Sequence, residues 1–350
     1  MRRAYTYTML VVLTWGFSQV ANKALLLARR EEVFLTPLQV AFWPVAVGWI
    51  ALLLLLAGRG RLGRVRHVAP RGWMVLAAMG FFGWVGHSVG RNIAFKLLPL
   101  PDGIMINYLH PVFVVMFQGA LFGAVARRVS GWERAQPGHG RPSLSVLLAA
   151  VTLCLLGVAM IATGGKLTAL GSMASLTGAL AGVFGAFAWG VYSNLGRFVS
   201  VRPGREGEEI TDVHSFAAMT VGLFIMAAAL AGSGALHLPS GYRMQLYLGA
   251  LGPATVPAWP LIALHGVVVY CAGYTLWLYA LAAGERAGGS HRLPLLTYLT
   301  PLLSISLGWV VLHESFGPGF WQGALLIAAG NVVSLLGTAK RRTVVEEDRG

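Results

Sequence analysis

Long apolar stretches separated by short polar connections recur along the whole chain. Each holds about 20 residues, the length that an α-helix needs to cross the hydrocarbon core of a bilayer. Hydrophobic periodicity would not separate such stretches from buried helices of a soluble protein, but their length and number do. The pattern predicts ten membrane-spanning helices, over Thr6–Leu27, Thr36–Ala57, Gly72–Leu98, Gly103–Ala124, Leu144–Thr163, Ala174–Gly196, Val213–Ala231, Ala258–Ala283, Leu293–Leu312 and Phe320–Leu336.

Residues 232–257 are the least clear part of this pattern. They are only moderately apolar and are rich in Gly and Pro, which are typical of turns and loops. We expect an external loop or an interfacial helix here rather than an eleventh span.

A short phrase occurs in both halves of the chain, as NYLHP at residues 107–111 and as TYLTP at residues 297–301. Further matches keep the same order: Trp73 and Gly80 match Trp259 and Gly266, and Trp15-Gly16 matches Trp189-Gly190. We interpret residues 1–165 and 166–350 as two copies of one five-span unit, the second with a short basic tail. Because five is an odd number, the second copy enters the membrane upside down, an arrangement typical of secondary transporters. The expected fold class is an all-α polytopic membrane protein with ten transmembrane helices in two inverted five-helix repeats.

Composition and charge agree with this class. Hydrophobic residues make up 56% of the chain and charged residues only 11%, whereas soluble domains carry about 25% charged residues. The net charge is +14, and most of the basic residues fall in alternate connections, including Arg59–Arg71. The positive-inside rule then places both termini in the cytoplasm and explains the basic residues without nucleic acid. Cys154 and Cys271 both fall inside spans, so neither a disulfide nor a metal site is expected.

Several motifs stand in the order known from one family. They are Trp15-Gly16 with Lys23, Pro37, Tyr108-x-x-Pro111, Trp259 with Gly266, Pro301 and Glu314. Over nearly its whole length the chain resembles EamA-like members of the drug/metabolite transporter superfamily. The resemblance implies ten helices in two inverted repeats, a bacterial inner membrane location and a central cavity. The chain departs from the family pattern at Trp43 and Ala124, where such repeats often carry Arg and Glu.

Polar side chains inside spans are costly in lipid and are therefore candidates for function. His87 and Arg91 are four residues apart on the third predicted span and share one helix face. We interpret Arg91 as an anion-binding group in the cavity; a snorkelling Arg91 and a His87 bonded to neighbouring backbone are the structural alternatives. Asn107 and His110 lie on the fourth span, and Thr300 on the ninth. They either face the cavity or bond between helices.

Aromatic and terminal polar residues are further candidates. Trp15, Trp189, Tyr274 and Tyr298 could stack on a substrate, although interfacial Trp and Tyr often serve as anchors. For Lys23, near the end of the first span, we favour a snorkelling anchor.

Two prolines occupy matching positions and predict kinks. Pro111 and Pro301 each remove a helical N–H, which we expect to free the carbonyls of Asn107 and Thr297 and to provide hinges. Glu314, which ends the ninth span, either latches an outer gate or caps the helix toward water.

None of the 13 acidic residues lies in the middle of a span, so the buried charges are basic and favour a substrate with a carboxylate. The sequence predicts a transporter that exports amino acids or similar small metabolites; a lipid or lipid-linked-sugar flippase of the same fold is the alternative. Proton coupling would use His87, His110 or His265, and a homodimer is compatible with the sequence. No catalytic motif is present, so we expect neither an enzyme nor a cofactor.

Overall fold

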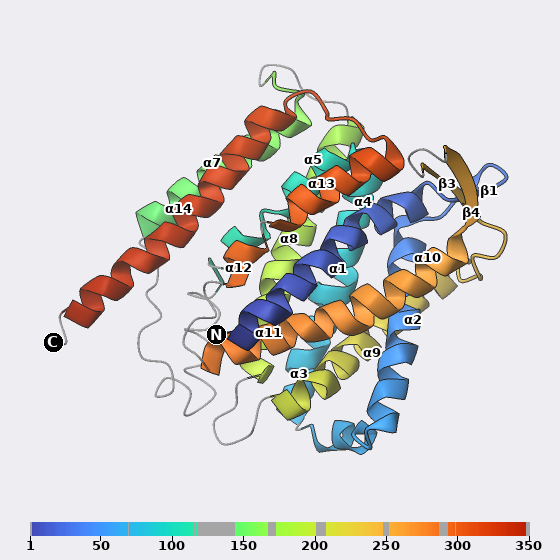
Figure 1. The fold of residues 1–350 in the computed structure, drawn as a ribbon, viewed down its shortest axis with the longest axis horizontal. Helices are drawn as coiled ribbons and strands as arrows, with labels where there is room; N and C mark the ends of the chain where they lie inside the picture. Colours follow the sequence, from blue (N-terminus) through green and yellow to red (C-terminus); the bar gives the residue numbers. More distant parts are fainter. Residues whose placement is uncertain are drawn as a thin grey trace.

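The computed structural model describes residues 2–68, 70–114, 116–117, 144–166, 173–200, 208–247, 252–286, 293–297 and 299–347. Most of them form a bundle of long helices (Figure 1). The α-helices are α1 (Arg2–Leu26), α2 (Pro37–Gly58), α3 (Pro70–Met79), α4 (Ser88–Leu97), α5 (Leu100–Asn107), α7 (Leu144–Ala162), α8 (Met173–Ser200), α9 (Glu208–Gly232), α10 (Ala258–His265), α11 (Tyr274–Arg286), α12 (Leu293–Leu296), α13 (Leu299–Leu312) and α14 (Phe320–Glu347). A short 3₁₀ helix, η1 (Leu62–His67), follows α2.

Seven helices in the described part of the chain are long and apolar enough to cross a membrane. Two of these seven are composite, because α3 continues into α4 and α10 continues into α11. The apolar helices Leu299–Leu312 and Phe320–Val333 are shorter. The predicted span Gly103–Ala124 is interrupted after α5, and its end lies outside the described residues. The chain is thus a multi-pass membrane protein.

Local sequence explains where α2 begins. Thr36 is its N-cap, and Pro37 occupies the first helical position, where the absent N–H of proline leaves no hydrogen bond unmade. The Gln39 N–H donates to Thr36 Oγ1 at 3.2 Å, and the Thr36 N–H donates to Gln39 Oε1 at 2.9 Å. This reciprocal capping box satisfies two of the backbone donors that a helix start leaves free.

The two composite helices share an unusual feature. Each passes through a π-helical segment, η2 (Gly80–His87) between α3 and α4 and η4 (Gly266–Gly273) between α10 and α11. Gly80 and Gly266, which the comparison of the two halves matched, are the first residues of these segments. A Cβ on Gly80 would lie 2.6 Å from the Ala218 carbonyl oxygen of α9, and one on Gly266 would lie 2.7 Å from the Pro44 carbonyl oxygen of α2. The absence of a side chain therefore lets each segment contact the backbone of a neighbouring helix.

The described residues among 232–257 form neither an interfacial helix nor a loop that lacks regular structure throughout. They contain β3 (Arg243–Tyr247) and β4 (Pro253–Pro257), which pair antiparallel. β3 also pairs with β1 (Arg29–Arg30), and β1 pairs with β2 (Val33–Phe34). This four-stranded sheet, of order β2-β1-β3-β4, corrects the all-α expectation. It joins the connection after α1 to the segment that precedes α10 at one end of the bundle (Figure 1).

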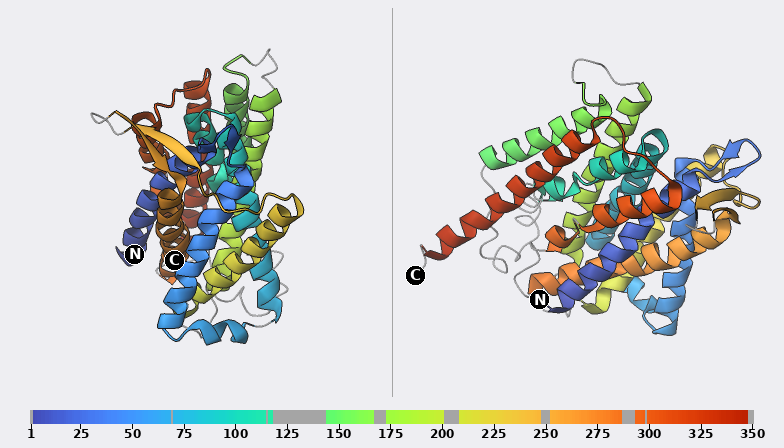
Figure 2. Two further views of the ribbon diagram at one scale, coloured as in Figure 1. Left: turned by 90° about the vertical axis from the view of Figure 1, so that its right-hand side faces the viewer. Right: turned by 45° about the horizontal axis from the view of Figure 1, so that its top comes forward.

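α7 and α14 form a pair at the edge of the bundle, beside each other in all three views (Figure 1, Figure 2). Their backbones approach closely, because a Cβ on Gly157 would lie 2.6 Å from the Gly323 carbonyl oxygen and one on Gly323 would lie 2.5 Å from that of Gly157. Small residues at such a crossing allow the close packing that holds helices together in a membrane.

Candidate functional site

A small cavity lies among the central helices, with a volume of about 20 Å³. That is room for about one water molecule. The lining side chains come from both halves of the chain: Trp15 and Gln19 of α1, His87 of η2, Arg91 of α4, Asn107 of α5, Tyr108 and His110 just after α5, Trp189 of α8 and Tyr274 of α11.

The structure brings together most of the residues selected from the sequence. Seven of the lining residues were candidates, whereas Gln19 and Tyr108 were missed. Signals for both were present, because Gln19 is a polar side chain inside a predicted span and Tyr108 belongs to the phrase repeated in the two halves. Thr300 is fully buried on α13 but is not among the lining residues. Tyr298 lies outside the described residues.

Arg91 is the only cation among these lining side chains. It is 3% exposed and therefore does not snorkel to the surface. Its Nη2 donates to the Tyr270 hydroxyl at 3.2 Å, and its Nε has no hydrogen-bond partner. Within the described part of the chain, no carboxylate forms an ion pair with it. A buried guanidinium without a counter-charge is unfavourable unless something else compensates it.

Three other lining residues also carry a buried polar atom without a partner. These are Trp15 Nε1, Gln19 Oε1 and Asn107 Oδ1. With Arg91 Nε, the cavity therefore presents two unpaired donors and two unpaired acceptors. Buried polar atoms are normally hydrogen-bonded, so such a concentration favours a site that a polar ligand completes.

Aromatic rings close around this centre. The Trp15 and Trp189 ring centroids are 5.1 Å apart in an edge-to-face arrangement, and Trp189 lies 5.5 Å from Tyr274. The His87 ring is 4.8 Å from that of Trp189. These mutual contacts leave little open volume around the polar centre.

The two histidines of the cavity are held by backbone carbonyls. His87 Nδ1 donates to the Gly185 carbonyl at 3.0 Å, and His110 Nδ1 donates to that of Asn107 at 3.2 Å. The expectation of a free Asn107 carbonyl beside Pro111 is therefore wrong: the His110 ring replaces the missing proline N–H. The Thr297 carbonyl is not free either, because it accepts from the Thr300 N–H at 3.0 Å.

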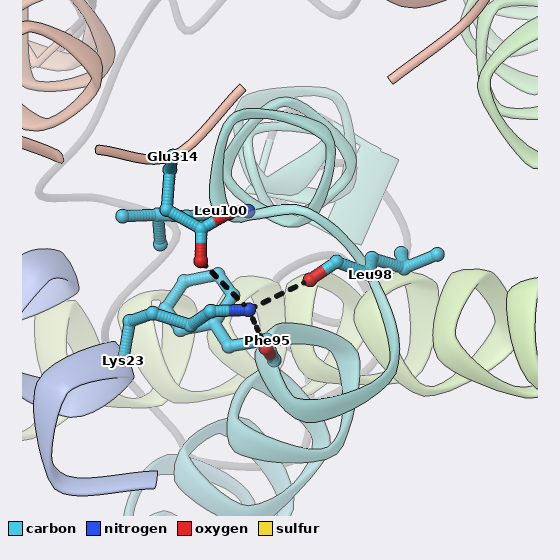
Figure 3. A network of polar contacts seen from close by, with 5 residues as sticks. All are labelled: Lys23, Phe95, Leu98, Leu100 and Glu314. Carbon is cyan, nitrogen blue, oxygen red and sulfur yellow. Dashed lines mark hydrogen bonds and ion pairs between the residues drawn. The ribbon is translucent and has the colours of Figure 1, made fainter. Parts of the chain in front are cut away.

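Lys23 does not act as a snorkelling anchor, contrary to the prediction. It is 7% exposed, and its Nζ donates to the carbonyls of Phe95 at 2.7 Å and Leu98 at 3.0 Å. The same Nζ pairs with Glu314 Oε1 at 3.2 Å (Figure 3). Each of the three ammonium protons therefore has an acceptor. Two of these acceptors are carbonyls at the end of α4, where the helix dipole favours a cation.

Glu314 connects this lysine to the start of the next helix. Its Oε2 accepts from the Leu100 N–H, the first of α5, at 3.1 Å. The cation thus caps the end of α4 and its carboxylate partner caps the beginning of α5 (Figure 3). We call Lys23, Glu314 and the backbone groups of Phe95, Leu98 and Leu100 the junction cluster. No local signal could reveal it, because its members come from three distant parts of the chain.

Comparison with known proteins points in one direction. The model of the EamA-like transporter family matches residues 2–130 and 176–336. The chain is 32% identical over 65 residues to the permease-like protein YdzE of Bacillus subtilis (strain 168), which covers 19% of this chain and 78% of YdzE. One solved crystal structure superposes with a TM-score of 0.55 at 21% identity, covering 95% of this chain and 96% of its own.

Proposed function

The chain belongs to the EamA-like transporter family, and from this premise we propose that it exports small carboxylate-bearing metabolites such as amino acids. The observation that carries the proposal is the buried Arg91, which lines the cavity without a carboxylate partner in the described residues. A substrate carboxylate would supply the missing charge and accept from the guanidinium.

The remaining unpaired atoms support a zwitterion. The Gln19 and Asn107 side-chain oxygens can accept hydrogen bonds from a substrate ammonium group, and Trp15 Nε1 can donate to its carboxylate. A cavity without an acidic residue can therefore hold both ends of an amino acid. The surrounding rings of Trp189 and Tyr274 suit an apolar substrate side chain.

In the proposed mechanism, ten helices in two inverted five-helix repeats alternate the exposure of this site between the two membrane faces. Residues 1–165 form the first repeat and residues 166–350 the second. The π segments that begin at the matched glycines Gly80 and Gly266 support this reading, since both pack on a helix backbone. Pro111 and Pro301 would act as the matched hinges, and the aromatic rings would part to admit the substrate. The distribution of arginines supports an inner-membrane location with both termini in the cytoplasm.

Purified protein in liposomes tests the proposal. Selected amino acids should exchange across the membrane and should raise the melting temperature of the protein, because a ligand that binds only the folded state stabilises it. Arg91→Gln should abolish both effects, whereas Arg29→Gln, a change at the exposed strand β1, should leave them intact. Lipid scrambling without amino acid flux would instead support the flippase alternative, and unchanged flux in Arg91→Gln would remove Arg91 from the site.

A further inference from the structure

The junction cluster lies next to the cavity. Lys23 follows Gln19 by four residues on α1, and Phe95 follows Arg91 by four residues on α4. Four residues are one helical turn, a rise of about 6 Å. Glu314, from the connection between α13 and α14, reaches across this level to α1 and α5. The cluster therefore ties the two halves of the chain together one turn beyond the cavity.

A second carboxylate fastens the same connection to α5. Asp102 is 4% exposed, and its Oδ1 accepts from the Gly317 N–H at 3.3 Å. The Asp102 carboxylate fills the place that a side chain on residue 317 would occupy. Among the described residues no cation forms an ion pair with Asp102. The connection thus reaches α5 through Glu314 and through the backbone of Gly317.

The charges at this place do not balance. Lys23 contributes one positive charge, while Glu314 and Asp102 each contribute a negative charge when ionised. α13 brings no titratable side chain, His313 directly precedes Glu314, and Lys96 of α4 is exposed. Ionised Asp102 thus leaves one buried negative charge without a cation of its own among the described residues, which is unfavourable.

Burial has the expected effect on this carboxyl group. Asp102 precedes the predicted span Gly103–Ala124, and none of the seven long apolar helices contains it. Burial raises the pKa of Asp102 to about 7, and the neighbouring Glu314 adds to the rise, against the opposing effects of the Gly317 N–H and Lys23.

We propose that Asp102 is the proton-binding site of this transporter and that its protonation holds the junction cluster closed. The proposal rests on the alternating access of the proposed function. It replaces the three histidines that the sequence suggested for proton coupling. To open this side of the cavity, the connection carrying Glu314 and Gly317 must separate from α1 and α5, which exposes Asp102 to water.

The direction of the pH effect follows from the two environments. Exposed to water, Asp102 has an ordinary pKa of about 4. The closed state, with its higher pKa, therefore binds the proton more tightly than the open state. As the pH falls below the closed-state pKa, protonation increasingly favours the closed state. The free-energy preference for the closed state stops growing once the pH is below the open-state pKa. Above pH 7 the proton is lost from both states, and opening no longer depends on pH.

Accessibility of a cavity cysteine measures this opening without any substrate. In a chain carrying Cys154→Ala and Cys271→Ala, Gln19→Cys places one thiol in the cavity. The rate at which this thiol reacts with a membrane-impermeant reagent is measured with the reagent on each side of the membrane in turn. That rate is divided by the rate for a reference variant, Glu32→Cys, whose thiol lies in the exposed turn between β1 and β2. This ratio removes the pH dependence of the thiol chemistry. From the junction side it should rise about tenfold per pH unit between pH 5 and 7 and then level off.

The same measurement on two variants assigns the titrating group. Asp102→Asn keeps an acceptor for Gly317 but cannot lose a proton, so its ratio should stay low and flat across the pH range. Gly317→Ala displaces the Asp102 carboxylate, so the ratio in this variant should also be independent of pH. This variant tests the assignment if Asp102→Asn does not fold. A flat ratio in the otherwise unmodified chain, or a slope that persists in a folded variant, would overturn the proposal. Neither result would alter the binding of amino acids at Arg91, which the melting-temperature assay tests separately.

Discussion

Arg91 and Tyr270 come from different halves of the chain and meet at its centre, where the guanidinium Nη2 donates to the phenol oxygen at 3.2 Å. Arg91 belongs to α4, just after the first π segment, and Tyr270 lies within the second. Tyr270 is fully buried. The hydroxyl from one half therefore holds the guanidinium that lines the cavity, and we expect Tyr270 to act as a positioning residue.

Tyr270→Phe should weaken substrate binding without unfolding the protein. The variant keeps the ring and removes only the acceptor, and a hydrogen bond to a charged group contributes about 1.5–3 kcal/mol. We expect KM for amino acid flux in liposomes to rise about tenfold while kcat changes little. Phe42→Leu, a buried change away from the cavity lining, serves as the packing control. An unchanged KM in Tyr270→Phe would show that Arg91 does not depend on this hydroxyl.

Lys23→Met should destabilise the protein strongly. It leaves Glu314 without its cation and the carbonyls of Phe95 and Leu98 without a donor. Loss of one partner of a buried ion pair costs about 3–5 kcal/mol, toward the low end here because Glu314 is partly exposed. Lys96→Met, at an exposed position on the same junction's helix α4, should change stability by less than about 0.5 kcal/mol. The melting temperatures of the two variants in detergent test this expectation. Similar melting temperatures for Lys23→Met and Lys96→Met would indicate that Lys23 is an ordinary anchor.

Gly80→Ala and Gly266→Ala should destabilise the protein to a similar extent. Each added Cβ would lie against a backbone carbonyl oxygen, of Ala218 and Pro44 respectively. Because backbone cannot move aside as a side chain can, we expect a loss of about 1–3 kcal/mol for each. The control is Gly58→Ala at the end of α2, where a new Cβ meets nothing within 4 Å. Denaturation in detergent measures the stability of the three variants. A loss of stability in only one of the two matched variants, or in neither, would contradict the prediction.

The sequence alone determined where most helices lie, because an apolar stretch of fixed length is a local property of the chain. It also placed His87 and Arg91 on one face, since four residues make one turn of any α-helix. The match of Gly80 with Gly266 falls at the residues where both π segments begin, but the sequence did not predict these segments. Their geometry depends on the neighbouring helix backbones that the glycines contact.

Only the tertiary structure decided which of these residues meet. Arg29 pairs with Arg243 in a sheet whose strands are too short and too far apart in sequence to leave a local pattern. Lys23 looked like a surface anchor, because its position near the end of a span is all that the sequence shows. Its three acceptors come from the end of α4 and from Glu314, and they are brought to it only when the helices pack. The burial of Asp102 arises in the same way, since the Gly317 backbone that covers it belongs to the opposite end of the chain.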